Sequence, residues 1–373
     1  MNDVIIVGAG IIGLSIAFEL QNRGKKCVII DPREPGSEAS WAAAGMLAPQ
    51  IETKRPSPAW VLGRYSRGLY SSWINALRTH SDIDPQLQTE GAALFLSAQD
   101  NLKETLRSYQ WQRDDGEPVD CKPARSILTE TRDQDQQAIF FANEAQVEPR
   151  LLCKLLIEAC KHIGVEFCLK ERAVRLIKSN DKVRGVQTEQ RTHFAETIVV
   201  CAGSWTQLIE GLSLRQDHVY PVRGQMLAIT TNNKERLPLL TNHRVYIVPR
   251  LDGSAVIGST EELVGFNRGT TAEGLNGIFT EAQNIWPSLS ESKILDTWCG
   301  FRPASRDHLP LIGPCAERGL YLATGHFRNG ILQAPATAQM IGQMITNEAC
   351  AIDPRPYAVS RVQTKEAKEI RRD

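Results

Sequence analysis

The stretch Val4-Ile5-Ile6-Val7-Gly8-Ala9-Gly10-Ile11-Ile12-Gly13 decides the fold of this chain. Its four leading apolar residues predict a buried strand, and the G-x-G-x-x-G spacing predicts a tight turn into a helix over residues 14–23. Gly8 permits the turn, Gly10 lets the backbone approach a pyrophosphate, and Gly13 lets the helix pack closely on the strand. Free amides at the start of such a helix attract anions. The opening segment is therefore typical of a dinucleotide site.

The residues after this motif favour FAD as the dinucleotide. A second apolar run, residues 27–30, ends at Asp31, where a carboxylate can hydrogen-bond a ribose 2′-hydroxyl and disfavours the 2′-phosphate of NADP. The three glycines alone do not distinguish an FAD site from an NAD site. The later run Ala39-Ser40-Trp41-Ala42-Ala43-Ala44-Gly45-Met46 lets a bulky ligand lie flat against backbone, and NAD enzymes need no such run here.

The closing segment Gly325-His326-Phe327-Arg328-Asn329-Gly330-Ile331 predicts a loop that enters a helix, with Pro335 in the first turn. The positive end of that helix would face the crevice and favour the negative charge of a reduced flavin. His326 is either a general base or a structural hydrogen-bonding residue, and its place beside a glycine turn favours the second. No second dinucleotide motif and no Cys-x-x-Cys pair occurs. Electrons are therefore expected to pass from substrate to flavin and on to oxygen or another diffusible acceptor.

Composition excludes several classes of function. The formal net charge is zero, which gives no electrostatic reason to expect nucleic acid or an anionic membrane as a partner. Nine cysteines without framework spacing indicate a reducing compartment and no metal site. The first strand starts at the N-terminus, and no apolar run approaches the roughly 20 residues of a membrane span. We expect a soluble, cytoplasmic protein.

The rest of the chain predicts two kinds of sheet. A helix around residues 152–163, a strand at 165–169 and a strand at 197–201 that runs into Ala202-Gly203-Ser204-Trp205 extend the first α/β unit, so three strand ends point toward one crevice. Residues 219–230, 244–250 and 255–260 read as strands, the last two joined by a hairpin with Asp-Gly. Hairpins indicate an inserted antiparallel domain. The charged end, residues 365–373, is expected to be a solvated helix or a frayed terminus.

Two residues, Arg302 and Tyr246, are candidates to bind a substrate carboxylate. Arg302 stands in Gly300-Phe301-Arg302-Pro303, where the proline holds it extended, and a planar guanidinium binds a carboxylate with two parallel hydrogen bonds. The alternative is an ordinary ion pair with Asp307 or a neighbouring acid. Tyr246 can add a phenolic hydrogen bond to the same carboxylate, or it is a core or cross-strand tyrosine.

These motifs together resemble the glycine oxidases of thiamine biosynthesis, in the D-amino-acid oxidase group of flavoproteins. The similarity runs essentially end to end, and the closing segment with Ala334-Pro335-Ala336-Thr337 is its more specific signature. The resemblance implies an α/β FAD-binding Rossmann-like domain (residues 1–84, 142–217 and 302–373) and an α+β substrate-binding domain with a mainly antiparallel sheet (residues 85–141 and 218–301). Besides the three glycines of the opening motif, it implies that FAD is held by Ile11, Ile12, Asp31, Ala39, Ser40, Ala44, Gly45, Met46, Val174, His326, Phe327, Arg328, Asn329, Gly330, Ile331 and Leu332.

The resemblance also assigns the substrate carboxylate to Arg302 and Arg328, with Tyr246 assisting. Arg244 and Glu261 depart from the relatives, which carry a histidine and an apolar residue there. We expect both on the hairpin strands. If they point inward, they pair with each other or Glu261 meets the substrate ammonium; if outward, they form a weak surface pair.

The implied reaction is oxidation of glycine and related small amines, such as sarcosine and small D-amino acids, by hydride transfer to flavin. Oxygen then gives hydrogen peroxide, and the imine either hydrolyses to glyoxylate and ammonia or supplies the thiazole of thiamine. The family implies a homotetramer. The main alternative is a D-amino-acid dehydrogenase that reduces a quinone. More distant alternatives are a flavin-dependent tRNA-modifying enzyme and a flavin-binding protein without catalysis.

Overall fold

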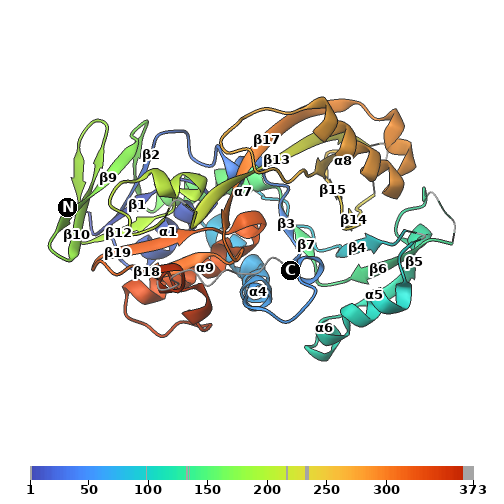
Figure 1. Cartoon of the computed structure of the whole chain (residues 1–373), viewed down its shortest axis with the longest axis horizontal. Helices are drawn as coiled ribbons and strands as arrows, with labels where there is room; N and C mark the ends of the chain where they lie inside the picture. The colour runs from blue at the N-terminus through green and yellow to red at the C-terminus, as the bar shows by residue number, and fades with distance from the viewer. Residues whose placement is uncertain are drawn as a thin grey trace.

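The first sheet forms the half of the molecule that contains the opening motif (Figure 1). The computed structural model describes residues 2–97, 99–131, 133, 135–215, 217–231 and 235–363. Within those residues the sheet has, in spatial order, β18 (Leu311–Pro314), β19 (Leu320–Thr324), β12 (Thr197–Val200), β1 (Val4–Val7), β2 (Cys27–Asp31) and β8 (Glu166–Leu169). All neighbours are parallel except the pair β18 and β19. This order confirms the predicted Rossmann-like unit.

Both faces of this sheet are buried, as the apolar composition of its strands requires. In β1, Val4 and Ile6 face a cluster that includes α1 (Ile11–Asn22), α7 (Pro149–His162) and α9 (Gly330–Ile345). Ile5 and Val7 face the other side, which a small antiparallel sheet covers. That sheet contains β11 (Thr192–Phe194), β10 (Lys182–Thr188) and β9 (Ala173–Ser179).

The second large sheet fills the other half of the molecule (Figure 1). In the described part of the chain its strands are, in spatial order, β17 (Ile294–Ser305), β13 (Val219–Thr230), β16 (Ser254–Gly258), β15 (Tyr246–Pro249), β14 (Leu239–Thr241), β4 (Ala92–Phe95), β6 (Gln137–Phe141) and β5 (Asp120–Pro123). Among the described strands of this sheet, only β14 and β4 pair in parallel. A short ladder of β3 (Met46–Leu47) and β7 (Ala145–Gln146) lies between the two halves. The predicted hairpin is confirmed as β15 and β16.

Strand β17 continues across the predicted domain boundary between residues 301 and 302. It pairs with β13 from Ile294 to Ser305, and that ladder continues past residue 302. The boundary therefore cuts a continuous ladder. We retain the two-domain division as a proposal, with β17 belonging to the second sheet along its whole length.

Helix α9 contains Pro335, and α4 (Pro58–Arg78) satisfies the backbone groups that the proline disturbs. The structure places Pro335 five residues after the helix start, which corrects the prediction of a first-turn proline. Proline has no amide hydrogen for the carbonyl of Ile331. The hydroxyl of Tyr70 donates to that carbonyl instead, and the Ser66 hydroxyl accepts from the amide of Ala336 at 3.2 Å.

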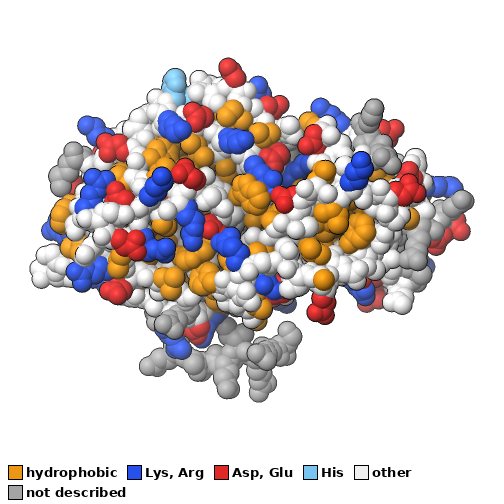
Figure 2. Space-filling model, turned by 90° about the horizontal axis from the view of Figure 1, so that it is seen from above, with side chains coloured by type: hydrophobic (Ala, Val, Ile, Leu, Met, Phe, Trp, Pro, Cys, Tyr) orange, Lys and Arg blue, Asp and Glu red, His pale blue; other side chains and the backbone are white. Residues whose placement is uncertain are grey.

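The remaining helices lie around the two sheets: α2 (Ala39–Ala42), α3 (Pro49–Glu52), α5 (Leu102–Ser108), α6 (Gln110–Asp114), α8 (Ala272–Ile285) and α10 (Ser360–Gln363). No helix in the described ranges is long and apolar enough to cross a bilayer. Basic and acidic side chains alternate over the face in Figure 2, in keeping with the balanced composition. The prediction for residues 365–373 concerns a segment outside the described residues.

We predict that Tyr70→Phe lowers the free energy of unfolding by about 1–3 kcal/mol, because it leaves the buried Ile331 carbonyl without a donor. Tyr65→Phe is the matched control, since its hydroxyl bonds the side chain of Gln339 at 2.7 Å in a half-buried position. Urea unfolding of the two variants measures both losses. An equal effect of the two substitutions would contradict this role for Tyr70.

Candidate active site

A cavity of about 650 Å³ lies where the two large sheets meet. Its walls include the carboxyl ends of β1, β2 and β12, together with residues of β13, β15 and β17. Ligands of open α/β sheets bind at the carboxyl ends of the strands. The three strand ends predicted to share one crevice do so.

The glycine turn brings backbone to the cavity wall. Gly8 has a φ of +112°, and a Cβ there would overlap the carbonyl oxygen of Cys201. A Cβ on Gly13 would overlap the carbonyl of Gly8, so close packing of helix and strand requires glycine at both positions. Helix α1 starts at Ile11 without a side-chain cap on Gly10, and the Ile11 amide donates to Ser40 Oγ at 2.9 Å. The positive end of α1 therefore faces the cavity.

Asp31 stands at the end of β2 and lines the cavity. Its carboxylate accepts from the amides of Ala9 at 2.7 Å and Arg33 at 2.8 Å. Burial raises the pKa of this carboxyl, and the two amide bonds oppose that shift. An ionised carboxylate has further acceptor sites. Asp31 can therefore brace the glycine turn and still accept from a ribose hydroxyl.

The run of small residues is fixed by contacts from the second half of the chain. Gly45 has a φ of +83°, and a Cβ on it would overlap the carbonyl of Val147. The partly buried Arg250 donates to the carbonyls of Ala44 at 2.7 Å and Val147 at 2.9 Å. Burial lowers the pKa of Arg250 to about 10, so it stays charged at neutral pH. Sequence reasoning missed this arginine because no local pattern marks it.

The closing segment forms the opposite side of the cavity. Phe327 adopts a φ of +49° and stacks on His308 with ring centroids 4.6 Å apart. His326 is fully buried and shares a 3.0 Å hydrogen bond with Thr337. Burial lowers the pKa of His326 to about 3, so the ring is neutral. This arrangement favours the structural role predicted for His326 over that of a general base.

Arg302 extends from β17 into the cavity without an acidic partner. Its guanidinium donates to the Thr260 carbonyl at 3.0 Å and to the Ser259 hydroxyl. It lies over Gly224 of β13, where any Cβ would overlap it. Among the described residues no carboxylate pairs with Arg302, while Asp307 pairs with Arg361 at 2.9 Å. The alternative of an Arg302–Asp307 ion pair is therefore wrong.

The other two predicted carboxylate-binding residues, Arg328 and Tyr246, line the same cavity but have different partners. Arg328 forms an ion pair of 2.9 Å with Glu52, which the sequence did not indicate. Tyr246 is the first residue of β15, and its hydroxyl contacts the Met226 sulfur at 3.8 Å.

The structure corrects the prediction for Arg244 and Glu261. Both line the cavity, but each lies just outside the hairpin strands, in the turn before β15 and in the loop after β16. Arg244 pairs with Glu281 at 2.9 Å and not with Glu261. Glu281 belongs to α8, and the hairpin pattern in the sequence offers no reason to place this helix beside Arg244. Glu261 is exposed, and no ion pair joins it to another described residue.

The cavity brings together nearly all the residues that the sequence nominated. Gly13 and Leu332 do not line it, because Gly13 packs against β1 and Leu332 is part of the core under α9. The Ala202–Trp205 segment also lines it. Lining residues that sequence reasoning missed include Glu52, Lys54, Met226, His243 and Ser259. They come from separate elements, Met226 from within β13 and the others from the end of α3 or from loops, and nothing in their spacing indicates that they converge.

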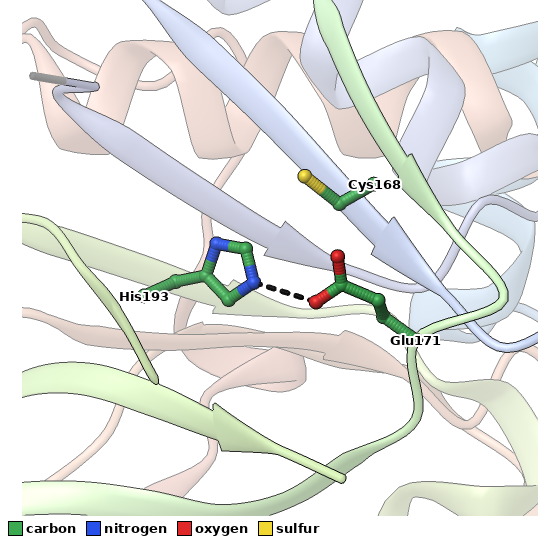
Figure 3. Close-up of side chains that lie close together, drawn as sticks. All are labelled: Cys168, Glu171 and His193. Atoms are coloured by element: carbon green, nitrogen blue, oxygen red, sulfur yellow. Dashed lines mark hydrogen bonds and ion pairs between the residues drawn. The ribbon is translucent and has the colours of Figure 1, made fainter. Parts of the chain in front are cut away.

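One group of potential metal ligands lies outside the cavity. Figure 3 shows His193 facing Glu171, with a hydrogen bond of 2.8 Å, and the Cys168 thiol beside them. The Arg191 guanidinium donates to Glu171 at 2.7 Å and to Cys168 at 3.3 Å. A cation already occupies this cluster, which favours a hydrogen-bonded brace over a metal site.

The fold and the cavity define a dinucleotide-dependent oxidoreductase. A family model described as FAD dependent oxidoreductase matches residues 3–344, and the chain belongs to that family. The glycine oxidase of Pseudomonas putida is 31% identical over 95% of this chain and 98% of its own length. The glycine oxidase of Geobacillus kaustophilus is 32% identical over 96% of this chain and 97% of its own length. The bifunctional protein ThiO/ThiG of Trichormus variabilis is 33% identical over 93% of this chain and 53% of its own length.

Solved structures agree with the fold. The crystal structure of glycine oxidase from Geobacillus kaustophilus superposes with a TM-score of 0.91 at 29% identity, covering 96% of this chain and 98% of that one. The predicted fold, a Rossmann-like FAD-binding unit with a substrate domain of the D-amino-acid oxidase type, is confirmed.

The residues present fit FAD. The turn at Gly8 and Gly10 and the start of α1, where Gly10 offers no side-chain cap, provide the backbone surface and amides that a pyrophosphate needs. Gly45 keeps side-chain atoms away from the cavity wall at the small-residue run. Which residues contact FAD stays a proposal, and the cofactor itself follows from the family.

We predict that Gly224→Ala displaces the Arg302 guanidinium and weakens binding of acetate to the FAD-loaded protein about 10- to 100-fold, because a charge-assisted contact is lost. Acetate binding is measured from the change in flavin absorbance. Gly277→Ala is the control, since a Cβ there meets nothing within 4 Å. Unchanged acetate affinity in Gly224→Ala would refute the proposed carboxylate site.

We predict that acid destabilises the protein partly through His326. In the unfolded chain the His326 ring is protonated below a pKa near 6.5, whereas in the folded protein it is protonated only near pH 3. Protonation therefore stabilises the unfolded state increasingly as pH falls from 6.5 toward 3, and the free energy of unfolding decreases. Between pH 8 and pH 5 the wild type should lose about 2 kcal/mol more unfolding free energy than His326→Gln. Denaturant titrations at both pH values measure this difference. An equal loss of unfolding free energy in the wild type and in His326→Gln would show that the folded protein does not hold His326 as a buried, neutral ring.

Proposed function

We propose that this protein is a glycine oxidase, which uses FAD to oxidise glycine and related small amines such as sarcosine and small D-amino acids. The guanidinium of Arg302 carries the proposal, because it enters the dinucleotide cavity without an acidic partner among the described residues. A carboxylate is the natural group to complete such a site. The similarity to glycine oxidases over nearly the whole chain supports glycine as the substrate.

The chain's own residues would orient the substrate. Arg302 binds the carboxylate, with Tyr246 and Arg328 assisting, and holds the Cα–H bond toward the flavin side of the cavity. The amine must lose a proton before oxidation, and no protein base is assigned because His326 is buried and neutral. When bound, FAD would supply the hydride acceptor for the substrate and the route of the electrons to oxygen. Glycine, oxygen and water then give glyoxylate, ammonia and hydrogen peroxide.

The relatives named ThiO/ThiG support a role in thiamine biosynthesis, where the imine is used before it hydrolyses. We further propose a cytoplasmic homotetramer, which analytical ultracentrifugation of the purified protein tests. The D-amino-acid dehydrogenase remains the rival and predicts turnover that requires an added quinone or dye.

We predict that anaerobic glycine bleaches the flavin and that air restores its absorbance with one hydrogen peroxide per glycine consumed. Arg302→Ala should lower kcat/KM for glycine by at least about 100-fold while FAD stays bound, because the carboxylate loses a charge-assisted bidentate contact. Arg361→Ala, which removes the partly buried arginine paired with Asp307, is the matched control. Peroxide-free turnover that needs a quinone would reject the oxidase in favour of the dehydrogenase.

A further inference from the structure

The charged side chains on the substrate side of the cavity differ in whether they have partners. Arg328 is paired with Glu52, and Arg244 with Glu281. Lys54, Glu261 and Arg302 also line the cavity, and no ion pair within the described ranges involves any of them. Two unpaired cations and one unpaired anion therefore face the same space.

Lys54 lies near the turn that leads into Tyr246, whereas Arg302 reaches the residue after the strand partner of Tyr246. Lys54 follows α3, and its charge acts on His243 in the turn between β14 and β15. Burial and the nearby Lys54 lower the pKa of His243, so that ring is neutral at pH 7 and adds no positive charge. The Arg302 guanidinium reaches Ser259, directly after the strand that pairs with Tyr246. The Tyr246–Gly258 pair of strands β15 and β16 links these two places.

A simple amino acid satisfies only part of this charge pattern. Glycine offers one carboxylate, for Arg302, and one amine, which Glu261 can accept as an ammonium. Glu261 directly follows Thr260, whose carbonyl binds Arg302. Lys54 then stays without an anion. A ligand with a second carboxylate separated from the first by a few bonds would pair both cations and match the net positive charge of the three groups.

We infer that Lys54 is a specificity-determining residue that binds a second carboxylate, so that the substrate class extends to amino acids with two acidic groups. This inference rests on the proposed function for its catalytic part, but the binding it describes needs no turnover. The site is the portion of the cavity between Arg302, Tyr246 and Lys54.

The binding test uses the FAD-loaded protein and two ligands that cannot be oxidised. Glutarate carries two carboxylates, and its monoamide glutaramate has the same shape with one. The wild type should bind glutarate roughly fivefold more tightly than glutaramate at low salt, which is the upper end of the range for an exposed ion pair such as one with Lys54. Added salt should reduce this ratio. Lys54→Gln should bring the ratio close to one. Lys161→Gln, a surface lysine paired with Glu158, is the control for net charge and should leave it unchanged.

The catalytic test compares D-glutamate with D-glutamine, which differ in the same charge. The ratio of their kcat/KM values should fall in Lys54→Gln by the factor seen in binding. A glutarate preference that survives in Lys54→Gln, or that Lys161→Gln removes equally, overturns the inference. A protein that prefers glutarate through Lys54 but whose flavin neither glycine nor D-glutamate reduces would contradict the proposed function and leave the second anion site standing.

Discussion

The guanidinium of Arg302, held by oxygen atoms that cannot neutralise it, is the constraint on which the site depends. The Thr260 carbonyl and the Ser259 hydroxyl fix its direction, and Gly224 leaves the room it occupies. A partly buried cation without a carboxylate is costly unless a ligand supplies the negative charge. The long pairing of β13 with β17 gives this cation a rigid base, because the arginine and the glycine beneath it lie on adjacent strands.

The second requirement is that this cation keeps a fixed position relative to the dinucleotide turn. The small-residue run makes that connection. The indole of Trp298 in β17 donates to the carbonyl of Ala42 at 3.0 Å, and a Cβ on Gly300 would overlap the Ala42 side chain. Arg250, which directly follows β15 of the same sheet, binds the carbonyl of Ala44. The two sheets are therefore joined at the cavity wall, so movement of one half would change the distance between carboxylate site and cofactor.

The features that could be predicted from the sequence are those that depend on residues close together in the chain. The strand, glycine turn and helix at Gly8–Gly13, the end of β2 at Asp31 and the Asp-Gly hairpin follow from periodicity and turn residues, and the cavity collects most of the residues so nominated. Long-range pairs were beyond the reach of such prediction: Glu52 with Arg328, Glu281 with Arg244, and Arg250 with Ala44 depend on which strands become neighbours. The contact between Tyr70 and the Ile331 carbonyl was equally beyond reach. Pro335 leaves that carbonyl in α9 without an amide donor, and the hydroxyl that replaces the donor comes from α4, far away in the sequence.

The most direct test of the central claim is a crystal structure of the FAD-loaded protein with glycolate, a hydroxy acid analogue of glycine. We expect the pyrophosphate at the start of α1, beside Gly10, and the glycolate carboxylate on the Arg302 guanidinium through two hydrogen bonds. A carboxylate bound at Arg328 or Lys54, with Arg302 still bonded only to Ser259 and Thr260, would contradict the account.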